Sequence, residues 1–368
     1  MFKQIKVRNF KNFQEELVFN LGTPNSYEFN DKLVRNNIIN DAVIVGKNAT
    51  GKTNLGYAIL DLASHLTDNT TKNMKAYLNL FSEMEYAEFE YTFEFDGIDV
   101  IYSYKKDNAA KLISENLMID GEVVIKDESG ERYVSLYGAE TLNIPEKKKE
   151  TISLVKYAYA NTQLNMCDER NKAFIDFMNF VQRMLWFSST EGNRYIGYMN
   201  SNGNMYSKIL EIDGGNPKPL EKFLRDLGIV YELTTEDTED GKSIFCRIGR
   251  KKIPLSSVVS SGTRSLIYFY FWYVQMSQVS FVYIDEFDAF YHTELAYRVL
   301  RKVIEIDSIQ TVLTTHNTDL ISNEILRPDC IFVLGRNQIK SLSDSTNKAL
   351  REAHNLQKMY KAGAFDEE

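Results

Sequence analysis

The sequence predicts an α/β fold, in which a buried parallel sheet has an antiparallel β region beside it. The first observation is the stretch 46–53, which fits the phosphate-binding loop pattern G-x-x-x-x-G-K-[ST] and lies between an apolar strand and a helix. The second is a pair of later apolar runs, 281–286 and 310–317, that end in polar residues. The third is the alternation of apolar and polar residues over 85–126, which is typical of antiparallel strands.

Length and composition exclude several classes of protein. The 368 residues suffice for two or three packed units, and 43% hydrophobic with 26% charged residues is ordinary for a soluble globular chain. A net charge of −8 disfavours nucleic-acid binding over the whole surface, while a local basic groove remains compatible with it. No apolar run of about 18 residues is present, so we expect no membrane contact. Distant cysteines at 167, 246 and 330 are typical of reduced thiols in a cytoplasmic protein.

The N-terminal segment, 1–20, is predicted to form two strands, and the polar stretch 21–40 a loop. The first strand has a basic edge, made of Lys3, Lys6, Arg8 and Lys11. Two interpretations stay open for these charges: a solvated strand face, which is the more common case, or contact with nucleic acid.

The phosphate-binding loop follows the apolar run 42–45 and precedes a helical pattern over 54–62. Backbone N–H groups of such a loop point at phosphates, and the helix dipole adds positive potential. Gly46 and Gly51 permit the close backbone approach, Lys52 would reach the β- and γ-phosphates, and the hydroxyl of Thr53 would bind magnesium. The residues predicted to bind the nucleotide here are Gly46, Lys47, Asn48, Ala49, Thr50, Gly51, Lys52, Thr53 and Asn54.

The middle of the chain is predicted from periodicity. Residues 85–126 should form an antiparallel meander with turns at Asp96-Gly97 and Asp120-Gly121. The stretch 127–230 should be mainly helical, with a stripe of apolar residues at helical spacing: Phe174, Phe177, Met178, Val181, Met184 and Leu185. Two further strands, near 230–233 and 244–248, lead to a basic cluster at 247–252 that is either a solvated hairpin end or a phosphate-binding patch.

The apolar run 281–286 ends in two acids. A carboxylate at a strand tip, here Asp285, can hold magnesium, and the adjacent Glu286 is placed to orient or deprotonate an attacking water. Upstream, the small polar residues Ser260, Ser261 and Gly262 precede an apolar helix. They either cap this helix in the ordinary way or leave its N-terminus free to bind an anion.

The strand 310–317 ends in hydroxyls and a histidine. His316 could hydrogen-bond a γ-phosphate, whereas His65, His292 and His354 have no comparable setting. His292 is therefore predicted to be structural or interfacial. With four histidines and scattered cysteines, the sequence predicts no dedicated zinc cluster.

Taken in order, these motifs resemble the ATP-binding-cassette (ABC) class of P-loop NTPases, and in particular the branch of RecF, SMC and OLD-family ATPases. The resemblance implies a fold like the ABC ATPase head, with an antiparallel β subdomain and a helical insertion. It identifies 46–53 as Walker A, Asp285 and Glu286 as Walker B, 260–263 as the signature, Asp288 as a D-loop residue and His316 as the switch histidine. Ser261 stands where the family has glycine, and Gln163 is the one candidate for the Q-loop glutamine.

The same resemblance divides the chain into 1–126, with Walker A and the meander, a helical insertion at 127–230, and 231–368, with the signature, Walker B and switch histidine. It implies an enzyme that binds ATP and Mg²⁺, hydrolyses ATP, and forms a homodimer or higher oligomer around the nucleotide. Such an ATPase would regulate a separately encoded effector, a nuclease or toxin, in bacterial antiphage defence. The alternatives are a RecF-like DNA-binding repair ATPase and a nuclease whose active site lies in the insertion.

Overall fold

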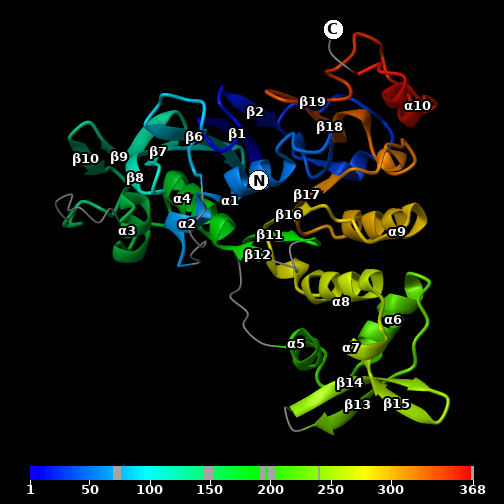
Figure 1. Ribbon diagram of the computed structural model, residues 1–368. Helices are drawn as coiled ribbons and strands as arrows, with labels where there is room; N and C mark the ends of the chain where they lie inside the picture. The colour runs from blue at the N-terminus through cyan, green and yellow to red at the C-terminus, as the bar shows by residue number, and fades with distance from the viewer. Residues whose placement is uncertain (69–75, 145–151, 191–194, 198–203, 239–240, 366–368) are drawn as a thin grey trace.

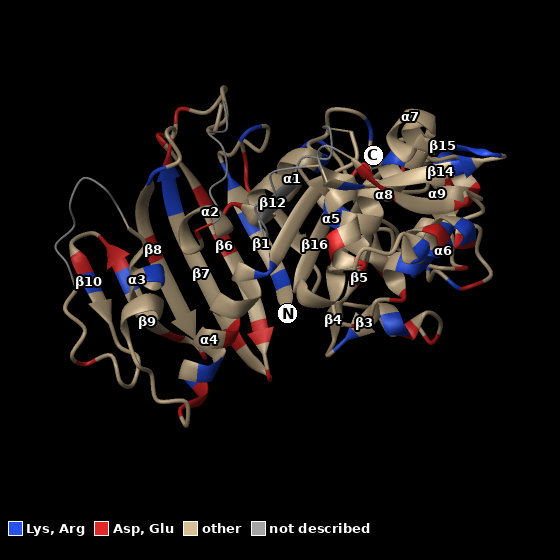
Figure 2. Cartoon of the chain, turned by 90° about the horizontal axis from the view of Figure 1, so that it is seen from below, with Lys and Arg blue, Asp and Glu red and all other residues tan. Residues whose placement is uncertain are grey.

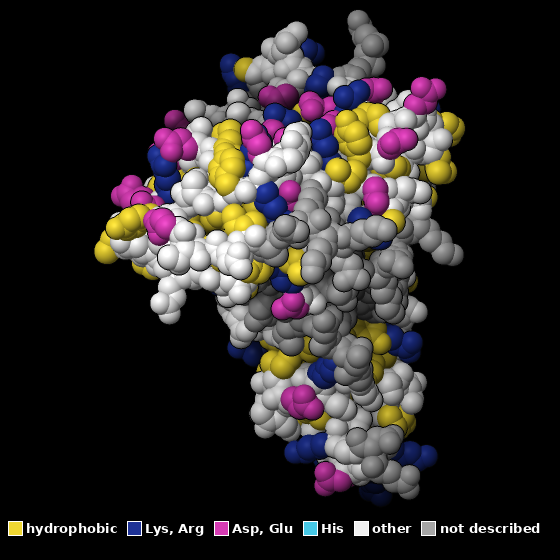
Figure 3. Space-filling view, turned by 90° about the vertical axis from the view of Figure 1, so that its left-hand side faces the viewer, with side chains coloured by type: hydrophobic (Ala, Val, Ile, Leu, Met, Phe, Trp, Pro, Cys, Tyr) yellow, Lys and Arg dark blue, Asp and Glu magenta, His cyan; other side chains and the backbone are white. Residues whose placement is uncertain are grey.

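The computed structural model describes residues 1–68, 76–144, 152–190, 195–197, 204–238 and 241–365. Within them two large sheets lie in the upper part of the molecule, and a small sheet with its helices forms a lower part (Figure 1). The space-filling view has the same outline, a broad upper part above a narrower lower one (Figure 3). No helix among these residues combines the length and the apolarity needed to cross a membrane.

The first sheet is antiparallel, with the strand order β10-β9-β8-β7-β6-β1-β2 in the described part of the chain. Buried and half-buried residues alternate along its long strands, so one face packs on the core and the other meets solvent. This confirms the predicted meander, which β10 extends at one edge and the two N-terminal strands extend at the other. The strands are β1 Phe2–Arg8, β2 Leu17–Asn20, β6 Tyr86–Phe95, β7 Ile98–Asp107, β8 Leu112–Ile119, β9 Glu122–Glu128 and β10 Glu131–Val134.

The second sheet has the order β12-β11-β16-β17-β5-β18-β19. Strands β11, β16, β17, β5 and β18 run parallel, so their carboxyl ends meet at one edge. Every residue of β11, β16, β17 and β5 is buried, as expected for parallel strands covered on both faces. The strands are β5 Asp41–Val45, β11 Met184–Ser188, β12 Tyr195–Gly197, β16 Phe281–Asp285, β17 Gln310–Thr315, β18 Ile331–Leu334 and β19 Ile339–Ser341.

Helix α1 lies between the two sheets. On one side Gly56 allows close contact with Tyr283 of β16 and Trp186 of β11, since an added Cβ would lie 2.6–2.7 Å from their side chains. On the other side Tyr91 of β6 donates a hydrogen bond to the carbonyl of Ala58 at 2.6 Å. The α-helices are α1 Lys52–Leu60, α2 Ala63–Leu66, α3 Leu154–Asn161, α4 Glu169–Gln182, α5 Met205–Ile212, α6 Lys218–Asp226, α7 Leu255–Val258, α8 Ser261–Tyr273, α9 Thr293–Ile304 and α10 Leu356–Lys361.

The lower part is built on a three-stranded antiparallel sheet, formed by β13 Leu233–Thr238, β14 Gly241–Ile248 and β15 Lys251–Pro254. Helices α5 and α7 pack on it, and α8 leads from it to the parallel sheet (Figure 1). The remaining short elements are the pair β3 Val34–Arg35 and β4 Ile38–Ile39 and the 3₁₀ turns Asp31–Leu33, Met276–Gln278, Thr318–Leu320 and Pro328–Cys330.

Three element predictions were wrong. Helix α4 ends at Gln182, and Met184 and Leu185 belong to strand β11 instead of continuing the helical stripe. A strand buried on both faces has no polar alternation, so its apolar run is indistinguishable from a helical one. The segment predicted as a loop over 21–40 contains the pair β3–β4, and the last helix, which the sequence predicts near 348–360, begins only at Leu356. The polar stretch 67–79, for which the sequence predicts a loop and a short helix, lies partly outside the described residues.

The first residue of β5, Asp41, is a buried acid. It is 2% exposed, and its Oδ2 accepts a hydrogen bond of 2.7 Å from Asn40 Nδ2. Burial raises the pKa of this carboxyl from 3.8 to about 7, against the smaller opposing effect of hydrogen bonds. The folded state therefore binds a proton that the unfolded state has released at mildly acidic pH, and stability falls as the pH rises from about 4 to about 7.

We predict that Asp41→Asn removes this pH dependence. At pH 8 the variant should be more stable than the wild type by a few kcal/mol, roughly the linkage energy of such a shift, and near pH 5 the advantage should shrink. Thermal unfolding at the two pH values measures this difference. Asp307→Asn, at an exposed ion pair with Arg35, is the control and should leave the pH dependence unchanged. An Asp41→Asn variant with wild-type pH dependence would contradict the assignment.

Candidate active site

The active-site candidates come together at the carboxyl edge of the parallel sheet. Strands β16, β17 and β5 are neighbours in that order, and each ends in one of the predicted motifs. The phosphate-binding loop follows β5, Asp285 and Glu286 end β16, and His316 follows β17. Segments far apart in the sequence thus form one site because parallel strands end side by side.

The phosphate-binding loop leads directly into the N-terminus of α1. Gly51, the residue before the helix, has φ 104°, a left-handed conformation that favours glycine. Gly46 is equally constrained, because an added Cβ would lie 2.7 Å from the carbonyl oxygen of Leu334. No side chain caps α1, so its first N–H groups remain available to an anion, and Lys47, Asn48 and Ala49 of the loop are exposed.

Lys52 lies under this loop with its ammonium group directed back at the loop carbonyls. Nζ donates to the carbonyls of Gly46 at 2.9 Å and Lys47 at 3.2 Å, and it lies 3.4 Å from His316 Nδ1. Burial lowers the pKa of Lys52, while the nearby carboxylates of Glu286 and Asp285 oppose that shift. A bound phosphate would supply the negative charge that this buried cation needs.

Asp285 is held between two hydroxyl groups. Thr53 Oγ1 donates to Oδ2 at 2.7 Å, and Thr314 Oγ1 donates to Oδ1 at 2.9 Å. Burial raises the pKa of Asp285, and these two hydrogen bonds partly offset the effect. A hydroxyl and a carboxylate oxygen side by side are the donors that Mg²⁺ takes in phosphoryl-transfer sites, where phosphate and water oxygens complete the coordination. Among the described residues no group of three or more His, Cys, Asp or Glu side chains is placed to hold a metal ion.

Glu286 and His316 face each other across the site. Glu286 has φ 49°, a left-handed conformation that is uncommon for a residue with a side chain, and its N–H donates to Thr314 Oγ1 at 2.8 Å. Its Oε1 lies 3.5 Å from His316 Nε2. Both side chains are partly exposed, so a water could reach the carboxylate. This geometry suits a general base next to a group that contacts the transferred phosphate.

Asp288 is tied to the end of β17. Thr315 Oγ1 donates to its Oδ2 at 2.7 Å, and burial raises the pKa of the Asp288 carboxyl. The same hydroxyl accepts from the N–H of Asn317 at 2.8 Å. This pair fixes the spacing between the segments that follow β16 and β17.

The signature residues lie apart from this cluster. Ser260 and Ser261 are exposed at the start of α8, and Ser260 Oγ accepts from the Thr263 N–H at 3.2 Å, an ordinary helix cap. Gly262 lies against Phe290, since an added Cβ would be 2.8 Å from that carbonyl oxygen. No hydrogen bond among the described residues joins 260–262 to 46–53.

Sequence reasoning gave no role to Asn12, which the structure places in the site. Its Nδ2 donates to the carbonyl of Thr50 at 3.1 Å, and its Oδ1 accepts from Asn54 Nδ2 at 2.6 Å. Thr314 was recognised only as a strand-end hydroxyl, although it binds both Walker B residues. The Q-loop candidate Gln163 is not brought to the site: it is exposed after α3, next to Gly138.

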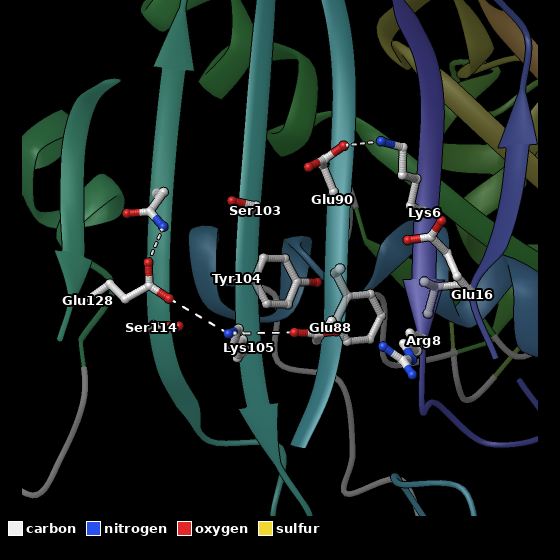
Figure 4. Close-up of a pocket in the computed structure, with 13 residues that line it drawn as sticks. Lys6, Arg8, Glu16, Glu88, Glu90, Ser103, Tyr104, Lys105, Ser114 and Glu128 are labelled. Carbon is white, nitrogen blue, oxygen red and sulfur yellow. Dashed lines mark hydrogen bonds and ion pairs between the residues drawn. The ribbon is translucent and has the colours of Figure 1, made fainter. Parts of the chain in front are cut away.

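The basic residues of the N-terminal strand are paired with acids. Lys6 bridges to Glu90 at 2.8 Å on the solvent face of the first sheet, where Lys105 lies 3.5 Å from Glu88 and 3.8 Å from Glu128 (Figure 4). Lys3 likewise pairs with Glu94 and Asp99. Because these lysines are paired with carboxylates, a solvated strand face is favoured over nucleic-acid contact.

The cluster at 247–252 lies on the hairpin β14–β15, where Lys and Arg residues lie near one end of the molecule (Figure 2). Arg247 and Lys252 form ion pairs with Glu232 and Glu236 on the neighbouring segment. The surface in Figure 3 also mixes both signs of charge instead of showing one large basic field. The RecF-like alternative therefore gains no support from charge.

Comparison with known proteins finds a family model that matches part of this chain and solved structures that resemble it at low sequence identity. Residues 206–322 match the family described as "AAA domain, putative AbiEii toxin, Type IV TA system". Among the curated proteins nothing matches. The SMC head domain from Thermotoga maritima is 15% identical, with a TM-score of 0.43, over 90% of this chain and 94% of that one.

Two further solved structures have similar overlap. The SmcHead bound to the C-winged helix domain of ScpA is 16% identical, with a TM-score of 0.47, and covers 93% of this chain and 98% of that one. The Smc head domain bound to the C-terminal domain of ScpA, derived from Pyrococcus furiosus, is 13% identical, with a TM-score of 0.46, over 93% and 97%. The family match spans 260–262, Asp285, Glu286 and His316. The structure itself confirms the predicted α/β fold, with a parallel sheet and an antiparallel β region.

We predict that Lys52→Ala abolishes ATP turnover, with a loss of at least about 100-fold, because we expect this ammonium group to bind the transferred phosphate. Phosphate release by purified protein measures the rate. Lys348→Ala, at an exposed position away from the sheet edge, is the matched control and should behave as the wild type. Wild-type turnover by Lys52→Ala would show that the loop is not the catalytic phosphate site.

Proposed function

We propose that this chain is a Mg²⁺-dependent ATPase that dimerises around ATP and uses its nucleotide state to control a separately encoded effector in bacterial antiphage defence. The observation that carries the proposal is the convergence of Lys52, Thr53, Asp285, Glu286 and His316 at the ends of three neighbouring parallel strands. The arrangement supplies a phosphate cradle, a cation, a metal site and a general base within one cluster.

Each residue has a chemical role in this proposal. The N–H groups of 46–53 and Lys52 bind the phosphates, and Thr53 with Asp285 holds Mg²⁺, which neutralises phosphate charge when bound. Glu286 orients and deprotonates the attacking water. His316, between Lys52 and Glu286, hydrogen-bonds the γ-phosphate and aligns both groups.

Two features of a single subunit support the proposed dimer. Glu286 and His316 are partly exposed, so the γ-phosphate side of the cluster is open. The exposed start of α8, with Ser260 and Ser261, is a second helix N-terminus that makes no hydrogen bond to its own phosphate-binding loop. Placed on the open side of a partner's site, it would add positive potential to the γ-phosphate, and ATP would favour association.

A mixing experiment tests catalysis across the subunit boundary. Lys52→Ala disables one phosphate-binding loop, and Ser261→Arg fills the anion site at the start of α8 with a bulky side chain. Each variant alone should be inactive, but a mixed dimer of the two contains one site with an intact loop and an intact partner signature. ATPase activity should therefore recover on mixing.

The control mixes Lys52→Ala with wild-type protein in the same ratio, which measures the activity expected from subunit exchange alone. Mixed dimers are confirmed by pull-down of differently tagged subunits. Confirmed mixed dimers without recovered activity would overturn the sandwich arrangement.

The proposed regulation of an effector in antiphage defence rests on the family match. The matching family is described as "AAA domain, putative AbiEii toxin, Type IV TA system", and a toxin–antitoxin context favours a role in defence. The described part of 127–230 holds no metal-binding cluster, so its chemistry does not favour a nuclease. Within this stretch Phe174, Phe177 and Trp186 are buried in the core, so their rings are not accessible to an effector.

We predict that Glu286→Gln, expressed from the native operon in a phage-sensitive host, loses protection in a plaque assay because ATP binds but is not hydrolysed. The neighbouring gene product should remain bound in a pull-down. Glu305→Gln, at the end of α9, is a control carboxylate away from the sheet edge and should protect fully. Full protection by Glu286→Gln, or by the ATPase gene alone, would overturn the regulatory role.

A further inference from the structure

The chain turns sharply where β16 ends, between Asp285 and Glu286. Glu286 has φ 49°, a left-handed conformation that is uncommon and unfavourable for a residue with a side chain. In a continuing strand the side chains of neighbouring residues would point to opposite faces of the sheet. Here both carboxylates reach the same site: Asp285 accepts from Thr53, and Glu286 lies beside His316. The proposed roles of the two acids therefore depend on the contacts that hold this turn.

Thr314 of the neighbouring strand holds the turn. The regular pairing of β16 with β17 ends with Ile284 opposite Leu313, just before the turn. Beyond that point the N–H of Glu286 donates to the hydroxyl of Thr314 at 2.8 Å, and the N–H of Phe287 donates to the carbonyl of Thr314 at 3.2 Å. Thr314 is buried, and its backbone is paired with β5 on the other side. The turn is thus anchored to the interior of the sheet.

The hydroxyl of Thr314 makes two hydrogen bonds whose directions are fixed. An amide N–H can only donate, and an ionised carboxylate can only accept. The hydroxyl therefore accepts from the N–H of Glu286 and gives its single proton to Oδ1 of Asp285, 2.9 Å away. One oxygen atom thus joins the backbone of the proposed base to the proposed magnesium ligand. Without the hydroxyl both groups would lose this partner, and the left-handed turn would lose one of its two bonds to β17.

We propose that Thr314 is a positioning residue, whose hydroxyl keeps Glu286 in the conformation from which its carboxylate reaches the attacking water. The inference rests on the proposed function, in which Glu286 is the general base and Asp285 a magnesium ligand. A displacement of a reacting group by about 1 Å costs up to about 100-fold in rate. Among the described residues Thr314 makes no hydrogen bond to 46–53, so ATP binding should not depend on its hydroxyl.

Two substitutions at this position separate the hydroxyl from the shape of the side chain. Thr314→Val keeps the branched shape and removes the hydroxyl. Turnover at saturating ATP and Mg²⁺ should therefore fall about 10- to 100-fold, while the Kd for ATP stays within about two-fold of the wild-type value. Thr314→Ser keeps the hydroxyl and should retain most of the turnover. Thr311→Val removes a buried hydroxyl from the other end of β17, opposite Asp41, and is the matched control that should turn over ATP as the wild type does. Thermal unfolding checks that each variant is folded.

A double variant distinguishes positioning of the base from a purely structural effect. If Thr314 acts through Glu286, adding Thr314→Val to Glu286→Gln should reduce turnover by less than about two-fold, because no carboxylate base is left to position. A general disturbance of the sheet would instead lower the rate by the same factor in both backgrounds. Single-turnover measurements with protein in excess over ATP give the slow residual rate that this comparison needs.

The outcomes separate this inference from the proposed function. Wild-type turnover by Thr314→Val, with Glu286→Gln inactive, overturns the positioning role and keeps the proposed base. An equal loss in both backgrounds, or an equal loss in Thr314→Ser and Thr314→Val, also overturns it, because the effect would not come from the hydroxyl acting on the base. Wild-type turnover by Glu286→Gln overturns the proposed function itself, and the positioning role with it.

Discussion

The structure depends on the burial of helix α1 between two sheets of different kinds. Its residues from Leu55 to Leu60 are all buried, and its first residue, Lys52, accepts a hydrogen bond at its carbonyl from the hydroxyl of Tyr283 in β16. A helix packed on both sides cannot shift without disturbing both sheets. The N-terminus of α1 is thereby fixed at the edge where β16, β17 and β5 end. Because the phosphate-binding loop leads directly into this N-terminus, the loop is held at the same edge.

The other end of α1 is fixed by a buried ion pair. Asp61, just after the helix, accepts from Lys106 Nζ of β7 at 2.6 Å and from the hydroxyl of Tyr104 at 2.8 Å, and Lys106 also donates to Ser64. Burial lowers the pKa of Lys106, and the neighbouring carboxylate opposes that shift. Any shift that separated the two groups would leave a charge buried without a partner. The ion pair therefore favours one position of the antiparallel sheet against the helix.

Much of the site could be predicted because its signals are local. A glycine loop between a strand and a helix, and an apolar strand ending in Asp285 and Glu286, are each contained in a short stretch of sequence. Strand β11 was missed because it directly follows α4 and is buried on both faces, so the helical spacing continues through it. Asn12 was missed for another reason: its partner Thr50 is 38 residues away, and nothing local marks a side chain that joins two loops.

The segment 286–290 connects the proposed catalytic residues to the surface proposed for the dimer. Glu286 itself faces His316, Asp288 is bound by Thr315, and Phe290 lies against Gly262 at the start of α8. A few residues therefore span the distance between the proposed general base and the predicted signature of the same subunit. Because Asp288 is buried and hydrogen-bonded, a change in the position of Glu286 on hydrolysis would be passed along a constrained chain to α8. In the proposed dimer that helix start contacts the partner's nucleotide, so each hydrolysis event would act on the contact that holds the two subunits together.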